Sequence, residues 1–285
     1  MSSIPDVTTR VEDVRARVAR ARVGGAIIGL VPTMGALHEG HLSLMWRARS
    51  ECGYVVVSIF VNPTQFGPGE DFQKYPRDLG ADVQRVGEVG VDLAFAPEVE
   101  TMYPPGDSTF VEVTGTPPPG RCAPHRPGHF RGVTTVCARL FNIAGADRAY
   151  FGEKDYQQIQ IVKRMARDLK FPLEIVPVPT VREADGLAMS SRNAYLSAEE
   201  RKAAAVLYRA LSQARERFAK GERVAAVLVG AAQGVIESQP IVQVQYIELR
   251  DAETLAQVDR IERPAVLAVA AFVGKTRLID NVVLT

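Results

Sequence analysis

Continuous apolar runs and amphipathic stretches alternate along the first two thirds of the chain. Residues 26–31 and 54–61 are apolar runs rich in β-branched side chains, which is typical of strands buried on both faces of a parallel sheet. The same pattern predicts helices at 41–52, 78–89, 132–144 and 155–169 and strands at 91–96 and 148–151. This order predicts an α/β fold in which crossover helices join parallel strands and ligands bind beyond the carboxyl ends of those strands.

The pattern changes near residue 180, where the alternation of strands and helices ends. Ser197 and Glu200 have the spacing of a capping box, which predicts the start of a helix that runs to about residue 220. A second helix is expected at 224–236, followed by strands at 242–249, 265–273 and 277–284, the last two joined by a turn at Gly274 and Lys275. We therefore predict two domains, residues 1–180 with the parallel sheet and residues 181–285 as a smaller α+β domain.

Composition and charge exclude several classes of protein. The 285 residues include 34 basic and 33 acidic side chains, so the net charge of +1 provides no broad basic surface for nucleic acid or for an anionic membrane. The longest apolar run, residues 264–273, is too short to cross a bilayer. Cys52, Cys122 and Cys137 form no C-x-x-C pair, which argues against disulfides or a thiolate metal site and favours a cytoplasmic location. The N-terminal stretch predicts a surface helix, because it contains acidic residues that transit peptides largely lack.

The first candidate chemical motif is VPTMGALHEGH at residues 31–41, directly after the first expected strand. If a helix begins near residue 38, His38 and His41 project from one face of its first turn, where backbone N–H groups and the helix dipole attract phosphate. Gly35 and Gly40 would let a ligand approach the backbone closely. A pair of surface histidines or a metal pair are alternatives, but no Cys, His or carboxylate cluster supplies an obvious third metal ligand. The glycines and the preceding strand favour a nucleotide polyphosphate.

The second motif, DGLAMSSRN, occupies residues 185–193 near the expected domain boundary. The adjacent hydroxyls of Ser190 and Ser191 can contact the outer phosphates of a triphosphate, and the Arg192 guanidinium can neutralise the charge on departing pyrophosphate. Alone, such a loop is more typical of an ordinary linker. Its combination with the paired histidines is therefore what favours a nucleotide site.

These two motifs resemble the HIGH and KMSKS signatures of the nucleotidylyltransferase superfamily. Further motifs make the similarity closer, namely SIFVNPTQF at 58–66, YPRD at 75–78, RPGHFRGV at 126–133, FGEKDYQQ at 151–158, PTVREADGLAMSSRN at 179–193 and YIELRD at 246–251. Together these motifs cover nearly the whole chain and resemble the pantothenate synthetase, or pantoate–β-alanine ligase, family. One departure is Asp78, where that family more often has Thr, and it bears only on the local loop geometry.

The resemblance implies a Rossmann-like N-terminal domain with a smaller α+β C-terminal domain that closes over it. It implies the ATP-dependent condensation of (R)-pantoate with β-alanine through a pantoyl adenylate, with release of AMP and pyrophosphate. It also implies Mg²⁺ as cofactor and a cytoplasmic homodimer whose partners are the small molecules ATP, pantoate and β-alanine. Another adenylate-forming nucleotidylyltransferase remains the alternative, although it would lack the paired glutamines Gln65 and Gln158.

The same resemblance assigns roles to residues of these motifs. The residues expected to be catalytic are His38, His41, Lys154 and Arg192. The residues expected to contact ATP are Met34, Gly35, His38, His41, Gly152, Glu153, Lys154, Asp155, Val181, Met189, Ser190, Ser191 and Arg192. Gln65, Gln158 and Met34 are expected to bind pantoate, because neutral amides can hold a carboxylate and a hydroxyl without neutralising the nucleophile. Lys154 is expected to follow the α-phosphate from ATP to the adenylate as a mobile point charge.

A few other residues have roles that the sequence leaves more open. Asn62 is expected to position the glutamine loop, although an Asn before Pro is also typical of a turn. Arg126 and His129 belong to a proline-rich segment, residues 97–130, that is either a spacer or a lid over pantoate. Asp155 is expected to hold an ATP hydroxyl or a water molecule of the metal. The metal ligands themselves stay unassigned.

Overall fold

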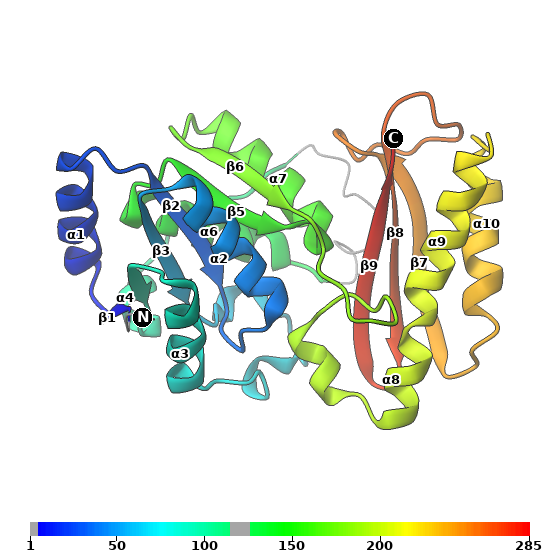
Figure 1. Ribbon diagram of the computed structural model, residues 1–285, viewed down its shortest axis with the longest axis horizontal. Helices are drawn as coiled ribbons and strands as arrows, with labels where there is room; N and C mark the ends of the chain where they lie inside the picture. The colour runs from blue at the N-terminus through cyan, green and yellow to red at the C-terminus, as the bar shows by residue number, and fades with distance from the viewer. Residues whose placement is uncertain (1–4, 115–125) are drawn as a thin grey trace. The chain divides into compact units, whose positions relative to one another are not determined.

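The computed structural model describes residues 5–114 and 126–285, and within these ranges the chain forms two compact units (Figure 1). Residues 5–114, 126–153 and 161–179 belong to the first unit, and residues 154–160 and 180–285 belong to the second. The chain therefore enters the second unit at residue 154 and again at residue 180. Cys122 and residues 115–125 of the expected lid lie outside the described residues. Of the helices in the described ranges, none combines the length and the apolarity that crossing a bilayer requires.

Six strands form one parallel sheet in the described residues of the first unit. Their bounds are β1 Asp6–Thr8, β2 Ile28–Thr33, β3 Tyr54–Ile59, β4 Leu93–Phe95, β5 Arg148–Gly152 and β6 Glu174–Val178, in the spatial order β1-β4-β3-β2-β5-β6. The predicted α/β fold is confirmed, and the apolar runs at 26–31 and 54–61 are the neighbouring central strands β2 and β3. Since β2 pairs with β3 on one side and β5 on the other, the strand order reverses here. Ligands of α/β sheets bind beyond such a reversal, next to the loops that follow β2 and β5.

The apolar pattern does not predict β1 or β6, which form the two edges of this sheet. β1 has only three residues, and β6 begins with the exposed Glu174 and contains Pro177. A strand at a sheet edge has a neighbour on one side only, so a short or proline-containing segment can serve there. The long apolar run that identifies a central strand is therefore missing from both.

Amphipathic helices cover the strands of the first unit. The bounds are α1 Val11–Val23, α2 Glu39–Glu51, α3 Leu79–Val89, α4 Val99–Met102, α6 His129–Ala144 and α7 Tyr156–Asp168, with short 3₁₀ turns η1 Pro63–Gln65, η2 Asp71–Gln73 and η3 Glu153–Asp155. α2 buries Leu42, Met45 and Ala48 in the same core as the strand residues around it. α6 begins at residue 129 rather than at the expected 132, after a left-handed Gly128 that serves as its N-cap.

The second unit consists, in the residues described, of a three-stranded antiparallel sheet and three helices. Their bounds are β7 Val242–Asp251, β8 Ala265–Val273, β9 Thr276–Leu284, α8 Ala198–Ala204, α9 Val206–Ala219 and α10 Ala225–Ile236, with the 3₁₀ turn η4 Ser191–Tyr195 before them. Val273 pairs with Thr276, so the expected two-residue turn is confirmed. Leu207 and Leu211 of α9 share a core with Leu267 of β8, which joins the helices to the sheet.

The helix expected from about residue 197 to 220 is wrong in one respect, because two helices meet at Ala205. The capping box is confirmed, since the Ser197 hydroxyl accepts the Glu200 N–H at 3.3 Å and the Glu200 carboxylate accepts the Ser197 N–H at 2.8 Å. Residues 203–207 are all buried, and five consecutive residues cannot share one face of a straight helix. α8 and α9 point in different directions in Figure 1, which lets the whole run be buried.

One glycine determines how closely α6 approaches η1. A Cβ atom at Gly132 would lie 2.6 Å from the Gln65 nitrogen and closer still to the Thr64 carbonyl oxygen. The Gly132 carbonyl also accepts a hydrogen bond from Asn62 Nδ2 at 3.1 Å. α6 and η1 therefore pack backbone against backbone, and a glycine at this position permits that approach.

Gly132→Ala is expected to lower the free energy of unfolding by about 1 to 3 kcal/mol, the usual cost of overpacking a close contact. Chemical denaturation followed by circular dichroism measures this change. Gly230→Ala in α10 is the matched control, because a Cβ there meets no atom within 4 Å. The control should raise the free energy of unfolding by roughly 0.5 to 1 kcal/mol, since alanine favours a helix over glycine. Equal effects of both substitutions would contradict the close approach described here.

Candidate active site

The two imidazole rings of the first motif face each other at the start of α2. His38 is the N-cap, and its Nδ1 accepts the Gly40 N–H at 3.1 Å. The His41 ring lies 4.1 Å from the His38 ring between centroids, and its Nδ1 accepts the His38 N–H at 3.3 Å. Because each Nδ1 is an acceptor, each neutral ring carries its proton on Nε2. The expected pairing of the two histidines at a helix N-terminus is confirmed, and each ring can donate from Nε2.

A buried carboxylate on α3 holds the turn that precedes these histidines. Asp82 is 4% exposed and accepts the N–H groups of Ala36 and Leu37 at 3.0 and 2.8 Å. Gly35 in the same turn has a φ of +77°, and a Cβ there would lie 2.7 Å from Asp82 Oδ2. Glycine is therefore required at residue 35 for both backbone conformation and space. Burial raises the pKa of Asp82, and its two hydrogen bonds from backbone N–H groups act in the opposite direction.

Asp82 was not among the residues predicted from the sequence, although a signal for it exists. Asp82 shares one face of α3 with the buried Val86 and Val89, and a lone carboxylate on such an apolar stripe is unusual. Asp78, the departure from the resembled family, is the N-cap of α3 and accepts the Ala81 N–H at 3.0 Å. Aspartate and threonine are both suitable caps, so this departure keeps the helix start intact.

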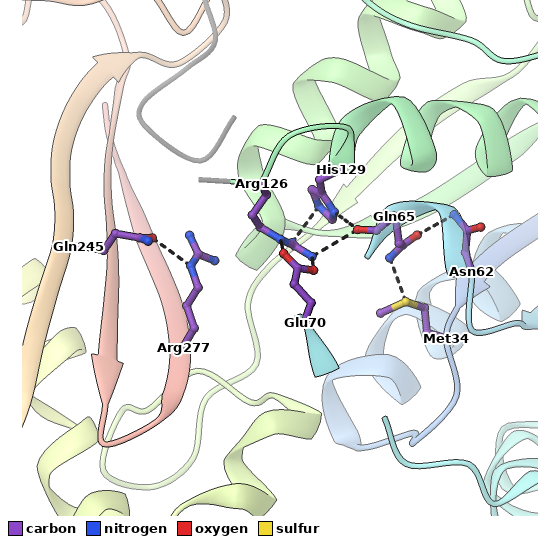
Figure 2. Close-up of polar contacts among 8 residues, drawn as sticks. All are labelled: Met34, Asn62, Gln65, Glu70, Arg126, His129, Gln245 and Arg277. Carbon is purple, nitrogen blue, oxygen red and sulfur yellow. Dashed lines mark hydrogen bonds and ion pairs between the residues drawn. The ribbon is translucent and has the colours of Figure 1, made fainter. Parts of the chain in front are cut away.

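Gln65 is held between two other polar or sulfur-containing side chains of the first unit (Figure 2). Its Nε2 lies 2.9 Å from Met34 Sδ, and its Oε1 accepts from Asn62 Nδ2 at 3.1 Å. Asn62 is 1% exposed, and its Oδ1 accepts from the Thr64 N–H at 3.3 Å and from the Tyr103 hydroxyl at 2.9 Å. The expectation that Asn62 positions the glutamine loop is confirmed. Tyr103, whose hydroxyl donates to Asn62, was not among the residues predicted from the sequence.

Arg126 and His129 contact the backbone of the same glutamine (Figure 2). His129 Nδ1 donates to the Gln65 carbonyl oxygen at 2.8 Å, and Arg126 Nη1 lies 3.0 Å from His129 Nε2. Arg126 also forms a bidentate ion pair with Glu70, with N–O distances of 2.7 and 2.6 Å. Burial raises the pKa of Glu70, but the Arg126 guanidinium, a backbone hydrogen bond from Gly67 and the charge of His129 together hold that pKa below its usual value. The role of Arg126 and His129 in a lid over pantoate stays a prediction.

The second motif forms a short hairpin in the second unit. The Met189 N–H donates to the Val181 carbonyl at 3.0 Å, and an antiparallel bridge one residue further in continues this pairing. Ser190 then caps η4, with its hydroxyl oxygen accepting the Arg192 N–H at 3.3 Å. Ser191 is the first residue of η4. These residues of the expected ATP set are thus fixed relative to one another.

A buried ion pair supports this hairpin from β9. Arg182 donates to both carboxylate oxygens of Asp280, at 2.7 and 2.9 Å, and Asp280 is 3% exposed. Burial raises the pKa of Asp280, and the charges of Arg182 and Lys154 act in the opposite direction. Neither Arg182 nor Asp280 was among the residues predicted from the sequence. The adjacent polar residues Asp280 and Asn281, which interrupt an apolar strand, are the signal that could have identified them.

The remaining expected residues lie around the end of β5. Gly152 ends β5 and Glu153 begins η3, both in the first unit, beside the reversal of strand order. Lys154 and Asp155 continue η3 and Gln158 lies in the first turn of α7, all in the second unit. The Lys154 carbonyl accepts a hydrogen bond from Asn281 Nδ2 at 3.0 Å. Within each unit, the expected residues therefore lie on the loops that follow strands or on the helix starts next to them.

Titratable side chains do not gather into a metal cage in the part of the chain that the structure describes. Over residues 5–114 and 126–285, three or more His, Cys, Asp or Glu side chains nowhere form a group that could hold a metal ion. Cys52 and Cys137 are buried free thiols, and burial raises the pKa of Cys137 to about 12. Neither thiol is thus suited to act as a nucleophile at neutral pH.

Comparison with known proteins gives matches along nearly the whole chain. A family model described as Pantoate-beta-alanine ligase matches residues 6–283. A pantothenate synthetase of Moorella thermoacetica is 56% identical over 271 residues, which cover 95% of each chain. One of Pelotomaculum thermopropionicum is 53% identical over 281 residues, covering 98% of each chain.

Solved structures are similar to this chain in both fold and sequence. A crystal structure of pantothenate synthetase from Thermus thermophilus superimposes with a TM-score of 0.92 at 50% identity and covers 97% of this chain and 98% of that one. A pantoate-beta-alanine ligase from Francisella tularensis, complexed with beta-gamma ATP and beta-alanine, superimposes with a TM-score of 0.80 at 33% identity and covers 98% and 97%. The chain therefore belongs to the pantoate–β-alanine ligase family.

Proposed function

We propose that this protein condenses (R)-pantoate with β-alanine to form pantothenate, using ATP and releasing AMP and pyrophosphate. The observation that carries this proposal is the family match over residues 6–283, together with relatives that are 50–56% identical over nearly their whole length. The complex of the Francisella relative with an ATP analogue and β-alanine supports two of the three substrates. The substrates are therefore a nucleotide, a hydroxy acid and an amino acid.

The first step requires charge neutralisation rather than an enzymic nucleophile. The pantoate carboxylate is already ionised at neutral pH, and one of its oxygens attacks the α-phosphorus of ATP while pyrophosphate leaves. The Nε2–H groups of His38 and His41 are donors suited to the phosphates, next to the N-terminal end of the α2 dipole. Met34 and Gly35, in the turn before this helix, are two further proposed nucleotide contacts of the first unit.

Gln65 and Gln158 are proposed to bind pantoate. The Gln65 amide is already oriented by Asn62 and Met34, so the Gln65 side chain would lose little conformational entropy when pantoate binds to it. An amide offers donors and an acceptor but no charge, and it therefore leaves the carboxylate nucleophilic. Met34 would contact both pantoate and the nucleotide.

The second unit supplies the proposed cationic contacts to phosphate. Lys154 would contact the α-phosphate in both steps, whereas Arg192, Ser190 and Ser191 would contact the phosphates that leave as pyrophosphate. The further ATP contacts that we propose are Gly152, Glu153, Asp155, Val181 and Met189. In the second step the β-alanine amine attacks the acyl carbon of the adenylate, AMP leaves, and the amine loses a proton.

We propose that Mg²⁺ accompanies the ATP phosphates. Magnesium is usually held by substrate phosphates, waters and one or two carboxylates rather than by a dedicated cage. Asp155 suits this arrangement, because it offers a carboxylate in the same 3₁₀ turn as Lys154, the proposed contact to the α-phosphate. This carboxylate would hold a water of the ion. When bound, Mg²⁺ would neutralise charge on the departing pyrophosphate.

The assembly and location are also proposed. A cytoplasmic location agrees with the buried free thiols Cys52 and Cys137, which suit a reducing compartment. The proposed homodimer rests on the resemblance described above. Light scattering of the purified protein would measure the assembly, and a mass of one chain at micromolar concentration would contradict the dimer.

The reaction is tested by incubating the protein with ATP, Mg²⁺, (R)-pantoate and β-alanine and following AMP and pantothenate by mass spectrometry. Omission of each substrate in turn is the control. Equimolar AMP and pantothenate are the expected products. If AMP forms only with another carboxylic acid in place of pantoate, the protein is a different adenylate-forming enzyme.

His41→Ala is expected to slow pantoyl adenylate formation by about 10² to 10⁴-fold, the effect of losing one contact to the transition state. Single-turnover measurement of pyrophosphate release gives this rate. Ser43→Ala is a matched control, because Ser43 lies in the same turn of α2 and its hydroxyl donates only within the helix, to the Gly40 carbonyl at 2.8 Å. A near-normal single-turnover rate for His41→Ala would exclude its role in this step.

Arg192→Lys is expected to lower kcat by more than about tenfold, because lysine keeps the charge but loses the planar fork that binds two phosphate oxygens. Steady-state kinetics with saturating substrates measure it. Arg164→Lys on α7 is the control, since Arg164 is paired with Asp168 on the surface at 2.6 Å. A kcat within about twofold of the unmodified protein for Arg192→Lys would show that charge alone suffices there.

Lys154→Ala and Gln158→Ala are expected to affect the two steps differently. Gln158→Ala should raise the KM for pantoate and slow adenylation, and it should have less effect on amine attack when pantoyl adenylate is supplied. Lys154→Ala should slow both steps, because AMP carries charge as it leaves. The two assays are pyrophosphate release from ATP and pantoate, and pantothenate formation from synthetic pantoyl adenylate. Equal losses in the second assay would contradict this division of roles.

A further inference from the structure

Two successive residues of β9 each hold a different segment of the proposed ATP site. Asp280 accepts both ends of the Arg182 guanidinium at the base of the hairpin that precedes Ser190. Asn281 donates from Nδ2 to the Lys154 carbonyl at 3.0 Å. Successive side chains leave a strand on opposite faces, so one short stretch of β9 can reach two segments that are far apart in the sequence.

The Arg182 guanidinium is used within the protein. Besides the Asp280 pair, its Nη1 donates to the Gly186 carbonyl at 3.1 Å and its Nη2 donates to the Asn281 carbonyl at 3.3 Å. Its carbon Cζ lies 3.9 Å from the centre of the Tyr208 ring. These contacts join the hairpin to β9 and to α9. Arg182 therefore supports the hairpin, and Arg192 is the arginine of this motif that we assign to ATP.

Burial makes these contacts hard to replace with water. Asp280 is 3% exposed and Asn281 is 7% exposed. The Asn281 N–H also donates to Asp280 Oδ1 at 2.8 Å, which orients the carboxylate toward Arg182. A buried carboxylate with a bidentate partner and a backbone donor has one favourable orientation. The backbone of β9 thus fixes the Asp280 carboxylate.

We propose that Asp280 and Asn281 are positioning residues that hold Lys154 and the Ser190–Arg192 segment in register for the same ATP molecule. The proposal rests on the roles given above to Lys154 and Arg192. Asn281 acts through Lys154 by fixing its backbone, and Asp280 acts through Arg182 on the hairpin. Neither side chain contacts the substrate in this proposal.

A double-mutant cycle between Asn281 and Lys154 tests the proposal. Asn281→Ala should slow both half-reactions about three- to tenfold, the effect of one lost hydrogen bond. In a protein that already carries Lys154→Ala, the same substitution should change either rate by less than about twofold, because the group that it positions is gone. Ser238→Ala is the control, since it removes a side-chain bond to a backbone carbonyl in the same unit, at the end of α10. The control should leave both half-reactions unchanged.

The same cycle is measured as affinity for a non-hydrolysable ATP analogue, with thermal unfolding of every variant. A loss that is equal with and without Lys154 would overturn the proposal, because a general loosening of the unit does not depend on that side chain. Unchanged rates and affinity for Asn281→Ala would overturn it as well. If the unmodified protein forms no pantothenate but the affinity cycle is non-additive, the positioning role stands and the proposed reaction fails.

Asp280→Asn supplies a second variant for the other segment. It keeps the shape of the side chain but removes the charge that Arg182 faces, and it should weaken binding of the ATP analogue by about tenfold. In a protein with Arg192→Ala, its effect should fall below about twofold. If Asp280→Asn does not fold, the Asn281 cycle alone decides the proposal.

Discussion

The buried Asp82 carboxylate accepts two backbone N–H groups, and the arrangement of the histidine motif in the first unit depends on this contact. This contact fixes the turn between β2 and α2, and with it the residue at which α2 begins. The N-terminal position of His38 and the close approach of the tilted His41 ring follow from that start. Two neutral rings with Nε2 donors are the chemical result. The turn before α2 is fixed because a helix that is distant in the sequence supplies the acceptor for its backbone N–H groups.

Buried polar side chains also hold two other loops, the η1 turn that carries Gln65 in the first unit and the hairpin before Ser190 in the second unit. Asn62 is almost fully buried and bonds to Gln65, to the α6 backbone and to η1, so the Gln65 amide is held in one orientation. In the second unit, the Arg182–Asp280 pair gives the hairpin a comparable anchor. Buried polar groups keep their partners because leaving them unpaired is costly, and this makes them suitable supports for loops.

Close backbone packing is the second constraint on the first unit. The absence of a side chain at Gly132 lets α6 approach η1, and the buried Gly132 carbonyl accepts a hydrogen bond from Asn62. The packing of α6 against η1 therefore determines both the orientation of the Asn62 amide and the location of Gln65. His129, the first residue of the same helix, and Arg126, which precedes that helix, contact the Gln65 carbonyl as well.

The sequence by itself determined the central strands β2 and β3, most helices, the capping box at Ser197 and the family, because burial periodicity and motifs are local properties of the chain. It did not identify β1 and β6, the break at Ala205, or the supporting residues Asp82, Glu70 and Asp280. Supporting contacts of this kind join residues that are far apart in the sequence. Asp82 binds residues 45 and 46 positions earlier, and Asn281, next to Asp280, binds a carbonyl 127 positions earlier. Local patterns reveal that a polar residue is buried, but only the tertiary structure decides its partner, since that partner is set by how separate elements pack.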